Sequence, residues 1–339
     1  MKTRGLADIA AGCASLSVGD DMLPAEPLVL VDLDRDEWSH LDDAVAALRT
    51  RSVVVVGVSN DPLPGHAAPL LEAFTCTLAP NGPGRSWAKG TAEEVDAIET
   101  VVAAAPRASI AMAGLLDLTS STDVRNGLIA ESLAYSMLLA GPEFADWRTN
   151  TPRRTVPDCA QPVLLDRDGD VLTLTLNRPE RHNAFAAQVR DGVIEGLSVA
   201  EYDDTITRVV LRGNGRSFCS GGDLDEFGTA TDVAAAHLVR LQRSAGYAVH
   251  RIANRVTAEL HGSCIGAGIE VPAFAARVVA HNDARFRLPE LTMGLVPGAG
   301  GTVSIPRRIG KWRTAFLALT NRPIDVATAL DWGLVDDRA

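Results

Sequence analysis

The stretch His261–Glu270, HGSCIGAGIE, decides the fold of the second half of this chain. It follows Val256–Leu260, VTAEL, whose residue types indicate a buried strand. Small residues let a backbone turn tightly, and the free N–H groups at a helix start carry partial positive charge. The stretch therefore predicts a strand that ends in a ligand-binding turn and leads toward a helix carrying Glu270.

Three further segments of the second half combine small residues with polar ones. They are NRPERHNAF (177–185), SFCSGGDL (217–224) and LPELTMGLVPGAGGT (288–302), the last of which contains Glu290. Two N–H groups that converge from separate turns form an oxyanion hole. Glu270 and Glu290 lie in apolar surroundings, where desolvation raises a carboxyl pKa toward the range useful for acid–base chemistry.

In this order, and together with ALDWGLVD (329–336), the segments resemble the crotonase (enoyl-CoA hydratase/isomerase) superfamily. The resemblance spans about residues 161–339 and implies an α/β fold, a spiral of ββα units that binds an acyl-CoA thioester. It implies that the N–H groups of Ser220 and Ala267 hold the thioester oxygen. It also implies that Glu270 deprotonates a water molecule and that Glu290 exchanges the α-proton.

The same resemblance implies contacts to coenzyme A, with Arg181 and His182 supplying positive charge. Because coenzyme A arrives as part of the substrate, neither a separate cofactor nor a metal is expected. A homo-oligomer, typically a trimer or hexamer in the family, is implied as well. The residues expected to contact coenzyme A are Arg181, His182, Ala184, Ser220, Gly221, Gly222, Asp223 and Leu224.

The retained pair of glutamates favours an enoyl-CoA hydratase, because hydration needs one carboxyl group for the water and another for the α-proton. Two alternatives stay open: an enoyl-CoA isomerase, in which one glutamate moves a proton, and a non-catalytic protein that binds coenzyme A or a partner. The family usually continues beyond GLVD (333–336) through further helices. The sequence ends soon afterwards, at Ala339, so a truncated C-terminal helical region is expected, which favours the non-catalytic alternative.

Prolines and polar residues at 149–162 predict a linker between two domains, 1–158 and 159–339. Upstream, apolar runs at 27–32 and 52–58, a helix at 42–48 and a capping box at Thr91–Glu94 indicate an α/β domain. Residues 101–114 align with 249–262, which suggests two tandem crotonase-like domains. Ile129 then falls opposite Glu270, so the first domain is expected to be non-catalytic.

Composition limits the remaining possibilities. The 339 residues are 46% hydrophobic and carry a net charge of −11, which is typical of a globular protein and argues against nucleic-acid binding. No apolar run reaches the roughly 18 residues of a membrane span, and the N-terminus lacks the apolar core of a signal peptide. Five scattered cysteines without a C-x-x-C pair argue against disulfides and zinc, so a cytoplasmic location is expected.

Overall fold

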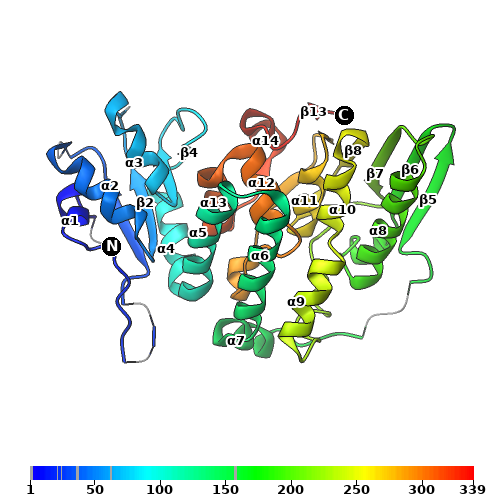
Figure 1. Ribbon diagram of the computed structural model, residues 1–339, viewed down its shortest axis with the longest axis horizontal. Helices are drawn as coiled ribbons and strands as arrows, with labels where there is room; N and C mark the ends of the chain where they lie inside the picture. Colours follow the sequence, from blue (N-terminus) through cyan, green and yellow to red (C-terminus); the bar gives the residue numbers. More distant parts are fainter. Residues whose placement is uncertain (1–2, 21, 24, 36–37, 62, 156–158) are drawn as a thin grey trace.

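The computed structural model describes residues 3–20, 22–23, 25–35, 38–61, 63–155 and 159–339. The molecule is elongated, and its chain begins at one end, shown in blue (Figure 1). Residues 163–202, shown in green, lie at the opposite end. The last 40 residues, in orange to red, return to the middle, so both halves of the sequence meet there.

The N-terminal half begins with a parallel sheet whose strand order follows the chain. Its strands are almost completely buried and rich in valine and leucine, as expected for a parallel sheet covered on both faces. The strands and the helix predicted between residues 27 and 58 are confirmed. The elements are α1 (Leu6–Ala10), β1 (Leu28–Asp32), α2 (Leu41–Arg49), β2 (Val54–Val58), α3 (Ala68–Ala73), β3 (Cys76–Ala79) and β4 (Ala88–Lys89).

Four helices follow: α4 (Ala92–Ala104), α5 (Pro106–Ser120), α6 (Val124–Leu139) and α7 (Pro142–Asn150). The predicted capping box is confirmed at the start of α4, where the Thr91 N–H donates to Glu94 Oε2 at 2.8 Å. Among the described helices none is long and apolar enough to cross a membrane alone, although α4 and α5, bent by 111°, pass that test as a pair.

The suggested internal repeat is wrong in its alignment. Residues 101–114 continue from α4 into α5, because Pro106 occupies the first turn of a new helix, where proline is favoured. Residues 249–262 instead run from α10 (Ala245–Arg251) into the strand β8 (Val256–Leu260). A helix pair therefore stands where the alignment requires a helix and a strand.

The second half contains a six-stranded sheet in the order β13-β10-β8-β7-β6-β5 and a three-stranded sheet in the order β12-β11-β9. The predicted hairpin is confirmed as β5 (Val163–Asp168) and β6 (Val171–Leu176), and the larger sheet is otherwise parallel. The other strands are β7 (Arg208–Gly213), β9 (Ser263–Ile265), β10 (Arg277–Ala280), β11 (Arg285–Arg287), β12 (Ile324–Asp325) and β13 (Asp337–Arg338). The helices are α8 (Ala187–Tyr202), α9 (Val233–Gln242), α11 (Ala267–Glu270), α12 (Gly301–Ile309), α13 (Lys311–Thr320) and α14 (Val326–Trp332).

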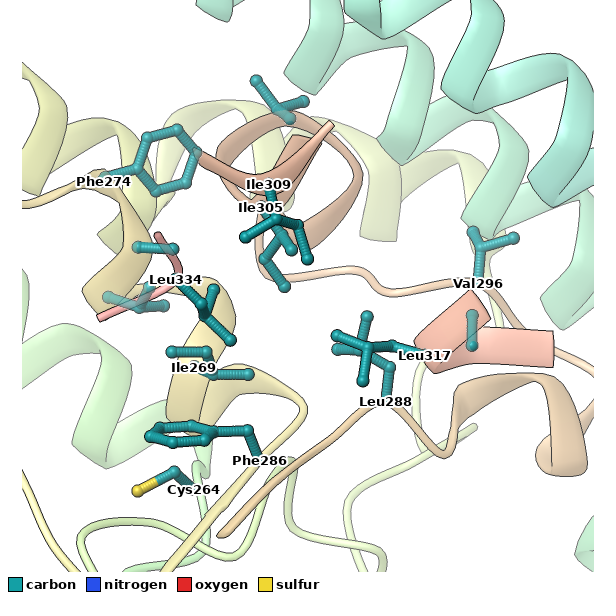
Figure 2. Packing of buried hydrophobic residues seen from close by; sticks show 14 of the residues in the cluster. Cys264, Ile269, Phe274, Phe286, Leu288, Val296, Ile305, Ile309, Leu317 and Leu334 are labelled. Carbon is teal, nitrogen blue, oxygen red and sulfur yellow. The ribbon is translucent and has the colours of Figure 1, made fainter. Parts of the chain in front are cut away.

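The two halves share a large hydrophobic core, and a second, smaller cluster lies within residues 6–87. Helix α12 packs on α5 and α6, and α13 packs on α4 and α5. In Figure 2, Ile305 and Ile309 of α12 lie within this core, near Leu288 and Leu317. Lys311 Nζ also donates to Asp117 Oδ1 of α5 at 2.6 Å. The predicted division at residue 158 thus does not separate two independent cores.

Candidate active site

A cavity of about 270 Å³ lies where the two halves meet. Helix α6 of the N-terminal half forms one wall, and α9, α11 and the loop before α12 contribute to the others. Its lining includes the two predicted glutamates, Glu270 and Glu290, together with Ala267, Gly222 and Asp223. Phe185 also lines it, so the fold brings together residues from all four predicted segments.

Glu270 is held by the backbone in front of α12. Its Oε2 accepts hydrogen bonds from the N–H groups of Ala299 at 2.7 Å and Gly301 at 2.9 Å. A Cβ atom on Gly301 would lie 2.6 Å from Glu270 Cγ, so the approach requires glycine. One carboxylate oxygen is thus fixed, and the other, Oε1, is left for chemistry.

Glu290 faces Glu270 across Gly266. A Cβ atom on Gly266 would collide with Glu290 Oε1 and would lie 3.6 Å from Glu270 Oε1. Gly266 has a φ of 49°, which also favours glycine. Glu290 Oε2 is buried and has no hydrogen-bond partner within the described part of the protein. The predicted pairing of the two carboxyl groups is therefore present in the structure.

Burial is the main cause of the perturbed acidity of both groups. It raises the pKa of Glu270 to about 7, against the opposing effect of the two N–H donors. Burial, and then the nearby Glu270 charge, raise the pKa of Glu290 well above its ordinary value. Near neutral pH Glu270 is thus partly ionised, while the surroundings of Glu290 favour its neutral form.

A third carboxyl group, Glu131 of α6, joins this cluster and was missed by the sequence analysis. Its Oε1 accepts from the Gly300 N–H at 2.7 Å, and its Oε2 accepts from the Thr302 N–H at 2.9 Å and the Thr302 hydroxyl at 2.7 Å. Burial, followed by the Glu270 charge, raises the pKa of Glu131 to about 8. The cavity-lining residues Leu128, Glu131, Ser132 and Tyr135 share one helix face, a spacing that the sequence displays.

The oxyanion prediction holds for one residue and fails for the other. Ala267 begins α11, and its N–H has no acceptor within the described residues. The Ser220 assignment is wrong, because its N–H donates to the His182 carbonyl at 3.0 Å. Gly222, two residues later, lines the cavity, and its N–H has no protein acceptor in the part of the chain described. Ala267 and Gly222 are therefore the candidate oxyanion donors.

Most residues predicted to contact coenzyme A have hydrogen-bond or ion-pair partners within the protein. Arg181 Nη2 donates to Asp223 Oδ1 at 2.9 Å and Asp225 Oδ2 at 2.6 Å, so the expectation that it supplies free positive charge is wrong. Asp223 is 1% exposed and also pairs with Arg178 at 3.3 Å, an arrangement that braces the turn.

The remaining predicted contacts are also engaged in the turn. The His182 ring lies 3.3 Å from the Ser217 hydroxyl. The carbonyls of Ala184, Gly221 and Leu224 accept from Arg178, the Phe185 N–H and Arg148, respectively. Of the eight predicted contacts, Gly222 and Asp223 line the cavity. Among the described residues, no group of acidic, histidine or cysteine side chains has the arrangement of a metal site.

Known proteins resemble about half of this chain. A family model described as enoyl-CoA hydratase/isomerase matches residues 166–338. The chain is 35% identical over 175 residues to 2,3-dehydroadipyl-CoA hydratase of Escherichia coli, covering 52% of this chain and 68% of that one. It is 31% identical over 177 residues to trans-2-decenoyl-[acyl-carrier-protein] isomerase of Streptococcus mutans, covering 51% and 67%. Among solved structures, Pseudomonas aeruginosa DspI matches with a TM-score of 0.50 and 26% identity, covering 55% of this chain and 77% of that one.

Proposed function

Because this chain belongs to the enoyl-CoA hydratase/isomerase family, we propose that it adds water reversibly to the double bond of a 2-enoyl-CoA thioester. The observation that carries this proposal is the pair of buried glutamates, Glu270 and Glu290, that face each other across Gly266. Hydration requires a base for the water and an acid for the α-carbon, and the two environments suit these two roles.

In this proposal the thioester lies in the cavity with its double bond between the glutamates. Glu270 Oε1 removes a proton from water while the water oxygen bonds to the β-carbon. Glu290 delivers a proton to the α-carbon, and the syn product results because both groups act from one side. The proton taken by Glu270 returns to Glu290 before the next turnover, which the short separation across Gly266 favours.

The charge that develops on the thioester oxygen would be stabilised by the N–H groups of Ala267 and Gly222. Both lie at the cavity and are free of protein acceptors in the described residues. Such preorganised donors typically contribute about 3–4 kcal/mol each to transition-state stabilisation. Coenzyme A then serves as part of the substrate, and the proposed reaction uses no other cofactor.

A second candidate, enoyl-CoA isomerisation, uses the same site with one active carboxyl group. The similarity to an isomerase at 31% identity favours keeping it. Isomerisation needs a single group that removes a proton from one carbon and returns it to another. The unpartnered Glu290 Oε2 fits that role as well as it fits the acid of a hydratase.

One pair of assays separates these candidates. A hydratase consumes the absorbance of the conjugated thioester when crotonyl-CoA is supplied. An isomerase generates that absorbance from a 3-enoyl-CoA and leaves crotonyl-CoA unchanged. Calorimetric binding of coenzyme A without either change would support the non-catalytic alternative. The homo-oligomeric state and cytoplasmic location stay predictions, which sedimentation and cell fractionation test.

A further inference from the structure

We propose that Glu131, supplied by the N-terminal half, is a positioning residue that fixes the Ala299–Thr302 loop and thereby sets the orientation of Glu270. This inference rests on the proposed function. It gives the N-terminal half a part in the active site, where the sequence analysis expected a non-catalytic domain.

The hydrogen bonds along the loop alternate between two carboxyl groups. The N–H groups of Ala299 and Gly301 donate to Glu270, at 2.7 and 2.9 Å. Those of Gly300 and Thr302, which lie between and after them, donate to Glu131 at 2.7 and 2.9 Å. Four successive amides are thus divided between one glutamate from each half of the chain. A shift of the loop that weakens one set of bonds must disturb the other.

The surroundings hold Glu131 itself in place. Glu131 is 2% exposed on α6, and three hydrogen-bond donors from the loop contact its two carboxyl oxygens. The next residue, Ser132, accepts a hydrogen bond from Arg240 Nε of α9 at 3.0 Å and lies 2.8 Å from His237 Nδ1. The loop is therefore tied to a helix that is itself braced by α9.

The charges around Glu131 give its role a measurable signature. Glu270 and Glu290 approach it from α11 and from the turn Glu290–Met293, Tyr135 lies on its own helix, and Arg240 and His237 lie on α9. Coulombic repulsion by Glu131 raises the pKa of Glu290, and the Glu270 charge raises the pKa of Glu131. Removing the Glu131 carboxyl therefore lowers the pKa of Glu290, whereas Glu270, which has the lower pKa, titrates before Glu131 gains its charge.

The principal test is Glu131→Gln in the full-length protein. A glutamine keeps the shape but offers one acceptor and one amide group to donors that need two acceptors. We expect kcat for crotonyl-CoA hydration to fall on the order of 10²-fold with KM little changed, as small misplacements of catalytic groups do. The limb of the pH profile that reports Glu290 should move to lower pH. Unchanged kcat and an unchanged profile would overturn the proposal.

Two companion variants separate positioning from general stability. Glu94→Gln alters a glutamate that caps α4 in the same half, so it should leave kcat and the pH profile unchanged. Thr302→Val removes only the hydroxyl donor to Glu131 and should shift the profile in the same direction by a smaller amount. If Glu131→Gln does not fold, this variant decides the matter. Equal losses of activity in Glu94→Gln and Glu131→Gln, each parallel to the loss of folded protein, would refute a positioning role.

A readout without substrate covers the case in which the proposed function fails. With ¹⁵N-labelled glycine, the Gly301 amide reports on the bond to Glu270 and the Gly300 amide on the bond to Glu131. If wild-type protein turns over no enoyl-CoA, the proposed reaction is wrong. The positioning inference still stands if Glu131→Gln shifts the Gly301 amide signal as well as that of Gly300, and it falls if the Gly301 signal is unchanged.

Discussion

Two clusters of buried carboxyl groups lie close together in this protein, and they differ in whether arginine side chains balance their charge. Asp223 and Asp225 are neutralised by Arg178 and Arg181, with Arg181 bridging both. Glu131, Glu270 and Glu290 have no ion-pair partner among the described residues; backbone amides and a hydroxyl hold the first two, and Glu290 keeps an unpartnered oxygen. Hydrogen bonds from Arg181 and from the Arg154 backbone lower the pKa of Asp225 to about 2, whereas burial raises that of Glu270 to about 7.

The difference shows that an acidic residue in a functional motif can serve structure or chemistry depending on its counter-charge. Burying a carboxylate costs free energy unless a cation or several donors compensate it. The aspartates are compensated and brace the SGGD turn. The glutamates are not fully compensated, which leaves them able to exchange protons near neutral pH.

The largest effect should come from the glutamates themselves. We expect Glu270→Gln and Glu290→Gln each to lower kcat by roughly 10²- to 10⁴-fold, because each removes a proton-transfer group while nearly preserving shape. Coenzyme A affinity, measured by calorimetry, should change little. If only one variant loses activity, the isomerase takes precedence over the hydratase, and if neither does, the chemistry lies elsewhere.

Removing a compensated charge should instead damage the fold. Asp223→Asn leaves the Arg178 guanidinium, which is 3% exposed, short of its counter-charge. The free energy of unfolding should fall by about 3–5 kcal/mol, as found when one partner of a buried ion pair is lost. Urea denaturation measures this. A loss below about 1 kcal/mol would mean that the Asp223 cluster is no more structural than a surface ion pair.

The candidate oxyanion donors are backbone N–H groups, so removing an N–H should matter more than changing a side chain. Ala267→Pro deletes a free N–H at the first residue of α11, a position where proline is tolerated, and should lower kcat about 10²- to 10³-fold. Ser220→Ala should leave kcat close to that of wild type, because it removes only the side-chain hydroxyl and keeps the N–H that donates to the His182 carbonyl. Circular dichroism confirms that both proteins are folded. Full turnover by folded Ala267→Pro would remove Ala267 from the oxyanion hole.

The smallest expected effect is a gain in the free energy of unfolding, whereas Asp223→Asn should cause a loss. Because the folded-state pKa of Glu290 is raised, its neutral form is favoured in the fold, and stability is lost as pH rises from about 4.5 toward the folded value. Glu290→Gln does not titrate, so it should be more stable than wild type at pH 8 and nearly equal at pH 4. Thermal unfolding at the two pH values measures the difference. A variant that is equally or less stable at pH 8 would show that Glu290 carries no burial penalty.

The sequence predicted the second half well because its motifs are local. The turns, the β5–β6 hairpin, the glutamate pair and Ala267 all follow from short stretches whose residue types restrict the backbone directly. Ser220 and Arg181 were misassigned because the direction of one N–H and the partner of one guanidinium depend on Phe185, His182 and Asp225. Such details require the folded turn.

Glu131 could not be placed because its partners are far away in the chain. The Gly300 amide that it accepts from lies 169 residues downstream. A helical spacing shows that Leu128, Glu131 and Tyr135 share a face, yet it does not show what that face contacts. The alignment placed Ile129 opposite Glu270, whereas the residue of that helix that reaches the site is Glu131, two positions later.

This long separation has a consequence for biosynthesis. Helices α4 to α6 leave the ribosome well before α12 and α13, the elements that cover their apolar faces. At roughly 5–20 residues per second, the 169 residues between Glu131 and Gly300 take roughly 10–30 s to synthesise. Throughout that interval the faces of α4 to α6 that α12 and α13 cover stay exposed on the nascent chain, and they are buried only when the last 40 residues have emerged.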